Sequence, residues 1–325
     1  MPTIAPVDVD GFVVRAGYLK DSAYFATGEG EVLFSAEGTK SIRPHKSGLL
    51  AAEPSRDHAC LVTSGDDGCI YACRADGTHE LLAERPRKWI DLIATGPSGA
   101  IAFASGRTAW VRDSDGTERE FNHERAVGGL AFAPKGNRLA VSRYDGATLW
   151  WAGRDSDPVT LSWKGAHLGI SFSPDGKYLV TAMQENALHG WRLSDTQDMR
   201  MSGYPAKVKS FSWSFKGKYL ATSGANAAIL WPFFGKTGPM GQAPLQLGAR
   251  GDAQVTAVAC HPKEEVVAIG YQDGMIVISR FADNAEVLLR RPGKGPVSTM
   301  DWDKDGNRLV FGTETAEAGI ISLQD

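Results

Sequence analysis

The sequence predicts an all-β fold built from repeated small antiparallel sheets. Trp151, Trp191 and Trp231 stand 40 residues apart, and each closes a short apolar run. A longer phrase repeats around them, and it reads "LAFAPKGNRLAVSRYDGATLWW", "ISFSPDGKYLVTAMQENALHGW" and "FSWSFKGKYLATSGANAAILW". A constant period near 40 is typical of repeat architectures, in which a single unit is too small to bury its own faces. We therefore expect the units to stack around a common axis.

Each phrase contains three strand-like segments and two turns. In the second copy, the alternating segment Ile170–Ser173 is followed by a turn at Pro174–Lys177 and a second apolar segment at Tyr178–Ala182. A tight polar turn then leads to the third segment, which ends at Trp191. Proline and glycine favour the backbone conformations of turns, and period-two alternation between such turns indicates strands.

Weaker copies of the phrase bring the number of units to eight. Their third strands are expected at Glu31–Phe34, Cys69–Cys73, Thr108–Arg112, Thr148–Trp151, Leu188–Trp191, Ile229–Trp231, Met275–Ser279 and Gly319–Leu323. A fourth short apolar run lies between units, for example at His79–Ala83, Val159–Trp163 and Glu286–Leu289. Each unit is therefore expected to have four strands.

These features resemble the WD-repeat β-propeller family over nearly the whole chain. The resemblance is carried by the SPDG turn at Ser173–Gly176, by the three tryptophans, and by the DG pairs Asp67-Gly68, Asp145-Gly146 and Asp273-Gly274. The family's His–Ser/Thr–Asp–Trp set is matched only in part: His167, Thr181 and Trp191 fit it, while Glu185 stands where aspartate is expected. The resemblance implies one WD40-like domain over residues 1–325, a closed β-propeller of four-stranded antiparallel blades.

The eight phrases favour eight blades, with seven as the alternative. The chain ends directly after a third strand, at Leu323, so the last blade lacks an outer strand. The segment Thr3–Val9 precedes the first phrase and is expected to supply it. Such pairing of the two ends would close the ring and protect an exposed strand edge.

Charge and cysteine content limit the class of protein. With 35 Lys and Arg against 38 Asp and Glu, the net charge is −3, which argues against bulk attraction to nucleic acid or to an anionic membrane. Cys60, Cys69, Cys73 and Cys260 are interpreted as free thiols; the alternative is a metal site formed by the first three with His58, although their spacing is not a standard zinc pattern. Free thiols and the lack of a visible secretory signal together predict a cytoplasmic protein. No metal or other cofactor is expected.

The sequence gives little support for catalysis. Gly235-Lys236-Thr237 ends like a phosphate-binding loop, but Leu230 occupies the position of the opening glycine. The zinc-protease, nucleophile-elbow and dinucleotide motifs do not occur. With the resemblance, this leads us to expect a non-catalytic scaffold or adaptor that binds protein partners through the loop-bearing top face; the alternative is an enzyme or small-molecule binder that uses the central channel.

Basic residues concentrate in the loops that join one unit to the next. The candidate partner-binding residues in these loops are Arg43, Lys46, Arg85, Arg87, Lys88, Trp89, Arg125, Trp163, Lys164, Tyr204, Lys207, Arg250, Arg290, Arg291 and Lys294. Arginine pairs well with carboxylate and phosphate, so we expect these loops to bind other proteins through an acidic or phosphorylated segment. The segment Arg85–Trp89 is the strongest candidate, because arginine and tryptophan are enriched at interface hot spots. Solvated loop charge without a partner is the alternative interpretation.

Overall fold

The computed structural model describes residues 2–36, 38–154, 156–235, 237–251 and 253–323. Within these residues the chain forms thirty β-strands and one short 3₁₀ helix, Pro97–Gly99. The chain divides into two compact units, which are described in turn. None of the helical structure in the described residues is long and apolar enough to cross a membrane.

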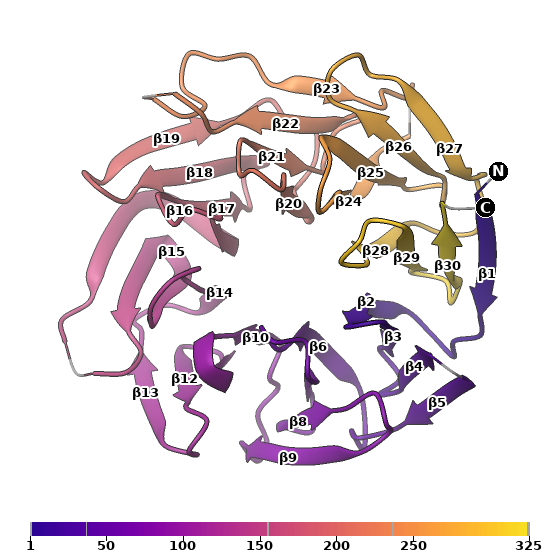
Figure 1. The fold of residues 1–325 in the computed structure, drawn as a ribbon. Helices are drawn as coiled ribbons and strands as arrows, with labels where there is room; N and C mark the ends of the chain where they lie inside the picture. Colours follow the sequence, from indigo (N-terminus) through magenta and orange to yellow (C-terminus); the bar gives the residue numbers. More distant parts are fainter. Residues whose placement is uncertain (1, 37, 155, 236, 252, 324–325) are drawn as a thin grey trace. The chain divides into compact units, whose positions relative to one another are not determined.

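Unit 1 comprises Met1–Arg43, Ala75–Gly77 and Tyr204–Asp325 and contains four four-stranded antiparallel sheets (Figure 1). The first sheet has β2 (Val13–Leu19), β3 (Ser22–Thr27), β4 (Val32–Ala36) and β5 (Gly38–Ile42). The second has β20 (Phe211–Trp213), β21 (Tyr219–Thr222), β22 (Ala228–Pro232) and β23 (Leu245–Leu247). The third has β24 (Val255–Cys260), β25 (Val266–Tyr271), β26 (Ile276–Arg280) and β27 (Glu286–Arg290). The fourth has β28 (Val297–Trp302), β29 (Arg308–Thr313), β30 (Ala318–Ser322) and β1 (Thr3–Val7).

The first strand of the chain completes its last sheet. β1 pairs with β30 in antiparallel register, with Thr3 opposite Ser322 and Val7 opposite Ala318. The prediction that Thr3–Val9 supplies the missing outer strand is therefore confirmed. Without β1, the backbone groups along one edge of β30 would lose their partners.

Unit 2 comprises Pro44–Arg74 and Thr78–Gly203 and contains three antiparallel sheets. One has β6 (Leu49–Pro54), β7 (Leu61–Gly65), β8 (Cys69–Cys73) and β9 (His79–Glu84). The next has β10 (Leu92–Thr95), β11 (Ile101–Ser105), β12 (Thr108–Arg112) and β13 (Glu118–Asn122). The third is six-stranded, with β14 (Val127–Phe132), β15 (Arg138–Trp151), β16 (Val159–Phe172), β17 (Tyr178–Met183), β18 (Ala187–Arg192) and β19 (Gln197–Met201).

The described residues thus form seven sheets, so the favoured count of eight blades is wrong and the alternative of seven holds. The cause lies in β15 and β16, which are 14 residues long and each contain residues expected in two strands. They pair with one another across a register shift between Tyr144 and Gly146, which joins the fourth and fifth phrases in one sheet. Positive φ at Asp145, Gly146 and Gly165 marks the places where the backbone departs from regular strand geometry.

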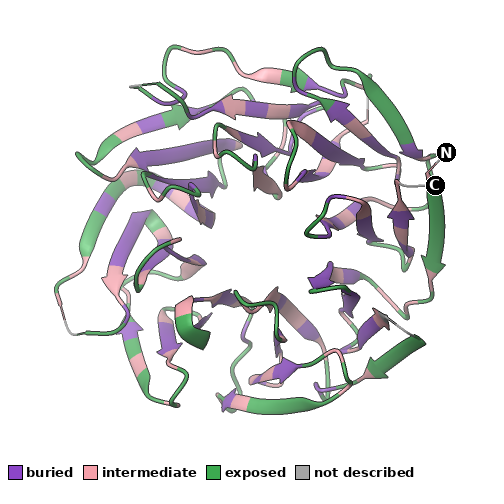
Figure 2. Ribbon diagram, in the orientation of Figure 1, coloured by how far each residue is buried: buried purple, intermediate pink, exposed green. Residues whose placement is uncertain are grey.

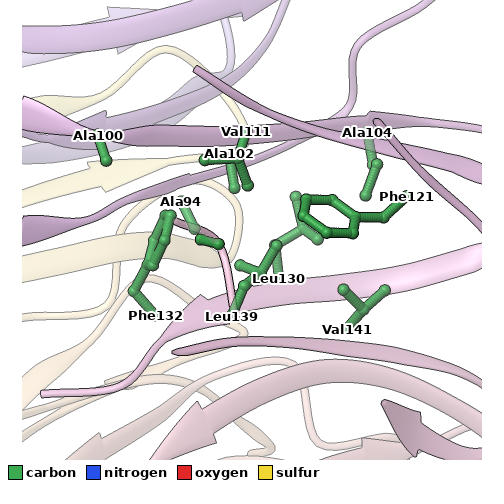
Figure 3. Close-up of a cluster of buried hydrophobic side chains, with 12 residues drawn as sticks. Ala94, Ala100, Ala102, Ala104, Val111, Phe121, Leu130, Phe132, Leu139 and Val141 are labelled. Carbon is green, nitrogen blue, oxygen red and sulfur yellow. The ribbon is translucent and has the colours of Figure 1, made fainter. Parts of the chain in front are cut away.

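Apolar side chains from neighbouring sheets form the core between them. In unit 2, Phe121 projects toward Leu130 and Phe132 lies beside Ala94, so the sheet β10–β13 packs on β14 and β15 (Figure 3). Trp191 is only 2% exposed and belongs to a cluster with Phe172 and Leu179, which confirms its predicted place in the core. The outermost strands β1, β5, β9 and β27 are mostly exposed (Figure 2).

Candidate protein-interaction site

In several sheets, a side chain from the loop before the first strand contacts the sheet that begins there. His45, in the loop before β6, is one example. Its Nε2 lies 3.0 Å from Thr63 Oγ1, and its Nδ1 lies 3.2 Å from a carboxylate oxygen of Asp67. Burial lowers the pKa of His45, although the hydrogen bond that His45 donates to the Asp67 carboxylate opposes this effect. The His–Thr–Asp network that the resemblance implied is therefore present here, with Tyr71 against the His45 ring in place of tryptophan.

In the sheet β20–β23 of unit 1, Tyr204 occupies the place that His45 has in its own sheet. Its hydroxyl lies 2.6 Å from Thr222 Oγ1 and accepts a hydrogen bond of 2.6 Å from Trp231 Nε1. The side chain is buried, with 8% exposed. Its prediction as a partner-binding residue is corrected on this ground, because a buried, hydrogen-bonded tyrosine offers no surface to a partner.

Arg85 and Arg290 occupy the place of His45 before their own sheets, but they contact a phenylalanine ring instead of a threonine hydroxyl. Phe103 and Phe311 stand where Thr63 stands in its own sheet, and the guanidinium carbon of each arginine lies 5.0 Å from the centre of the corresponding ring. A cation over an aromatic face is attracted by the ring quadrupole. The two arginines therefore fasten a loop to the next sheet, as His45 does by hydrogen bonding.

Carboxylates complete these contacts. Arg85 pairs with Glu118 and Arg290 pairs with Glu317, each at 2.5 Å, with arginine side chains only 19% and 12% exposed. Arg250 forms a related contact, since it pairs with Glu286 and lies over Tyr271 at 5.8 Å. We call Arg85, Arg250 and Arg290 the clamp arginines, because their charge is used within the protein.

The loop between β9 and β10 follows the clamp at Arg85. The Lys88 amide donates to the Arg85 carbonyl at 3.1 Å, and Pro86 and Arg87 are the central residues of this turn. Arg87 has a φ of +62°, a conformation that glycine usually supplies at this turn position. The loop lies close on Gly68, where a Cβ atom would come within 2.2 Å of the Arg85 carbonyl oxygen.

The end of this loop exposes a tryptophan between fixed residues. Lys88 Nζ lies 5.6 Å from the centre of the Trp110 ring, and Ile90 is fully buried, with its amide donating to the Gly65 carbonyl at 3.1 Å. Trp89, between them, is 69% exposed, more than any other large hydrophobic side chain in the described residues. We call Arg87, Lys88 and Trp89 the tryptophan loop.

Comparison with solved structures identifies the architecture. The chain is similar to the computationally designed Ika8 protein, with a TM-score of 0.79 and 18% identity over 97% of this chain and 98% of that one. It is also similar to the WD40 repeats of RRP9, with a TM-score of 0.65 and 17% identity over 87% of this chain and 96% of that one. The fold is a WD40-type β-propeller. No protein-family model matches the sequence, and no curated protein does.

The remaining predicted residues differ in how far they are available. Arg43 pairs with Asp10 and also donates to the Glu29 carbonyl at 3.1 Å, so much of its charge is used locally. Several exposed cations form no ion pair with any described residue: Lys46, Arg87, Lys88, Arg125, Lys164, Lys207, Arg291 and Lys294. Trp163 is half-buried, and its ring stacks on His189 at 4.1 Å.

Unit 1 contains a hollow of about 390 Å³ beside the inner strands β20, β24 and β28. Its charged lining residues are Lys207, Lys209 and Glu314, and Gln254 and Gln272 add amide groups. Among the described lining residues there is no histidine or cysteine. The hollow has both polar and apolar lining groups and is of a size for a small ligand or a peptide side chain.

The four cysteines are free thiols. Burial raises the pKa of Cys73 to about 12, so this thiol is protonated and unreactive at neutral pH. Within the part of the chain that the structure describes, no group of three or more His, Cys, Asp or Glu side chains is placed to hold a metal ion.

Proposed function

We propose that this protein is a non-catalytic scaffold that binds other proteins, and that the tryptophan loop of unit 2 contacts an acidic or phosphorylated segment of the partner. The observation that carries the proposal is Trp89, which is 69% exposed next to the fully buried Ile90. Arg87 and Lys88 stand next to it without an ion pair to any described residue.

The loop has the properties of a binding surface that is ordered before the partner arrives. The clamp at Arg85, the turn at Pro86–Lys88 and the buried Ile90 fix its backbone, so little conformational freedom is lost on binding. Tryptophan contributes a large apolar contact, and arginine pairs with carboxylate or phosphate through two parallel hydrogen bonds. Loops on a rigid sheet scaffold are common sites of recognition, and the WD40-type fold provides that scaffold.

The test uses a variant that leaves the clamp intact: Arg87→Glu, Lys88→Glu and Trp89→Ala together. Wild type and variant are immobilised, proteins are captured from a native lysate, and mass spectrometry compares the two sets at low and moderate salt. The matched control is Arg291→Glu with Lys294→Glu, which reverses exposed charge in the loop between β27 and β28. We expect specific proteins to be lost from the variant alone, most clearly at low salt. Identical sets from wild type and variant at low salt would refute the proposal.

A second candidate function is small-molecule binding, and the hollow in unit 1 favours it. Lys207 and Lys209 would attract an anionic ligand there. The test is calorimetric titration with small di- and tricarboxylates, with Lys209→Glu as the variant and the exposed Lys135→Glu as the control. Binding that Lys209→Glu abolishes would support this function.

For location, we propose the cytoplasm, because the four free cysteines are typical of a reducing compartment. The net charge of −3 favours protein partners over nucleic acid.

A further inference from the structure

A second feature of unit 2 lies where β15 and β16 depart from regular geometry. The pairing of these strands shifts register between Tyr144 and Gly146, and Gly165 has a φ of +129° on the facing strand. A hollow of about 460 Å³ opens between the two segments, lined by Arg143, Tyr144, Asp145, Ser162, Trp163 and Lys164. Strand irregularities of this kind often direct side chains toward a site.

Trp163 forms a fixed aromatic wall of this hollow. Its ring stacks on His189 at a centroid distance of 4.1 Å and an interplanar angle of 17°, and its carbonyl accepts a hydrogen bond from His167 Nε2 at 2.9 Å. His189 is fully buried, and burial lowers its pKa to about 3, so the ring behind Trp163 is neutral at physiological pH. Tyr144 also lines the hollow and is 44% exposed.

The charged residues that line the hollow favour an anion. Arg143 is held in place, because its Nε donates to Thr148 Oγ1 at 3.1 Å and its Nη1 donates to the Tyr144 carbonyl at 3.0 Å. Lys164 is exposed and has no ion pair with any described residue. The carboxylate of Asp145 accepts a hydrogen bond from the Gly165 amide at 3.3 Å. Two cations against one carboxylate leave the lining with a positive charge, which disfavours a cationic ligand such as a methylated lysine.

We infer that this hollow binds an aromatic side chain of a partner protein that carries negative charge on or beside its ring. The ring would pack between Trp163 and Tyr144, and Lys164 with Arg143 would pair with the negative charge. A phosphotyrosine and a tyrosine flanked by glutamates both provide this chemistry. The inference rests on the proposed scaffold function and adds the class of partner segment that one of its loops would accept.

The experiment measures binding of short fluorescent peptides to the purified full chain by anisotropy. The probes share one acidic sequence and differ at the centre, where they carry phosphotyrosine, tyrosine, phosphoserine or alanine. We expect the two aromatic peptides to bind about tenfold more tightly than the alanine peptide, the factor that about 1.4 kcal/mol of stacking gives. Tighter binding of phosphotyrosine than tyrosine identifies phosphate as the source of charge, and equal binding identifies the flanking carboxylates. Equal binding of all four peptides, or of the phosphoserine and phosphotyrosine peptides, would overturn the inference.

Variants locate the binding. Tyr144→Ala and Lys164→Glu should each weaken binding of the aromatic peptides about tenfold or more, because each variant removes a proposed contact of the ring or of its charge. Both side chains are exposed, so their loss spares the core. The matched controls are Val159→Ala, an exposed hydrophobic residue that also lies in β16, and Lys135→Glu, an exposed charge reversal elsewhere in unit 2. Unchanged affinity in Tyr144→Ala and Lys164→Glu would refute the site.

This result is separable from the test of the proposed function. The variant of the tryptophan loop keeps the hollow intact, so it should still bind the aromatic peptides at wild-type affinity. If that variant loses its captured proteins and the wild type binds none of the peptides, the scaffold function stands and the inference about the hollow fails. If the peptides bind and the captured set is unchanged, the role of the tryptophan loop fails instead.

Discussion

The loop between β9 and β10 and the loop between β27 and β28 begin alike and end differently. A clamp arginine stands at the beginning of each: Arg85 directly after β9, and Arg290 as the last residue of β27. Each lies 5.0 Å from the ring of a phenylalanine in the following sheet. After the clamp, the first loop turns through Arg87 and exposes Trp89, whereas the second continues through Arg291, Pro292 and Gly293 to Lys294 without an aromatic residue. The clamp that both loops share therefore stabilises the fold, and the residues after it, which differ, are the candidates for binding a partner.

The basic residues that the sequence grouped together fall into two kinds, the clamp arginines and the exposed cations. Concentration of Lys and Arg in equivalent loops predicted one binding surface, but Arg85, Arg250 and Arg290 form ion pairs and ring contacts within the protein. A charge reversal that includes Arg85 would disturb folding and binding at the same time. Tests of binding should therefore change Arg87 and Lys88 and leave Arg85 in place.

Among the residues of the two loops, the clamp arginines are expected to have the largest effect on stability. Arg85→Ala and Arg290→Ala should each lower the free energy of unfolding by about 2–3 kcal/mol, because a charge-assisted hydrogen bond and a ring contact are lost and a carboxylate is left unpaired. Urea denaturation measures the difference. The matched control Arg291→Ala, at an exposed residue, should change stability by less than about 0.5 kcal/mol. Equal, small changes in all three variants would show that the clamps are surface contacts.

Acid should weaken the clamp at Arg290. Burial raises the pKa of the Glu317 carboxyl, but the Lys294 amide and the Arg290 guanidinium outweigh it and hold the pKa below the ordinary value of 4.5. A lowered carboxyl pKa stabilises the folded state above pH 4.5, and this contribution is lost as the pH falls through the lowered pKa.

Glu317→Gln should therefore be less stable than wild type at pH 7, by about 1 kcal/mol or less for this partly exposed pair, and the difference should shrink in acid. Denaturation curves measured from pH 7 to pH 3 test this expectation. Glu314→Gln, an exposed neighbour, is the control and should track wild type throughout. A constant difference between Glu317→Gln and wild type at all pH values would contradict the pairing.

Much of the fold could be predicted because the repeated phrase records local backbone geometry. The expected third strands Cys69–Cys73 and Thr108–Arg112 coincide with β8 and β12. The joining of the fourth and fifth phrases was missed, because it depends on the backbone at Asp145 and Gly146 and on pairing between β15 and β16. The sequence of the turn at Asp145-Gly146 does not indicate that β15 pairs with β16 of the next repeat.

The candidate site could be predicted only in part, for a similar reason. Arg85–Trp89 was recognisable from composition, but the clamp requires Arg85 to meet Phe103 from a different sheet. A signal did exist, since Phe103 replaces the threonine found at this place in other sheets, such as Thr63 in β7. The hollow at Trp163 was only partly recognised: Trp163 and Lys164 were named, while Tyr144 was overlooked in a turn whose equivalents are small or polar.

A smaller effect is expected from the backbone of the tryptophan loop. Arg87 adopts a positive φ that glycine adopts without strain, so Arg87→Gly should raise the free energy of unfolding by up to about 1 kcal/mol. The same change at Arg291, which has no such φ, should be neutral or slightly destabilising. Thermal denaturation of the two variants provides the comparison. A loss of stability in Arg87→Gly would show that the side chain contributes more to the fold than its exposed position indicates.

The smallest effect on stability is expected from Trp89 itself. Because its side chain is 69% exposed, Trp89→Ala should change the free energy of unfolding by less than about 0.5 kcal/mol. The buried Trp191 is the matched tryptophan, and Trp191→Ala should cost about 3–5 kcal/mol, since it empties a packed site between sheets. Urea denaturation followed by circular dichroism compares the two without relying on tryptophan fluorescence. A large loss in Trp89→Ala would mean that this ring is covered within the folded protein, and the tryptophan loop would then have no apolar surface to offer a partner. A negligible loss leaves an exposed tryptophan that the fold does not need, which is the condition under which a role in binding explains its presence.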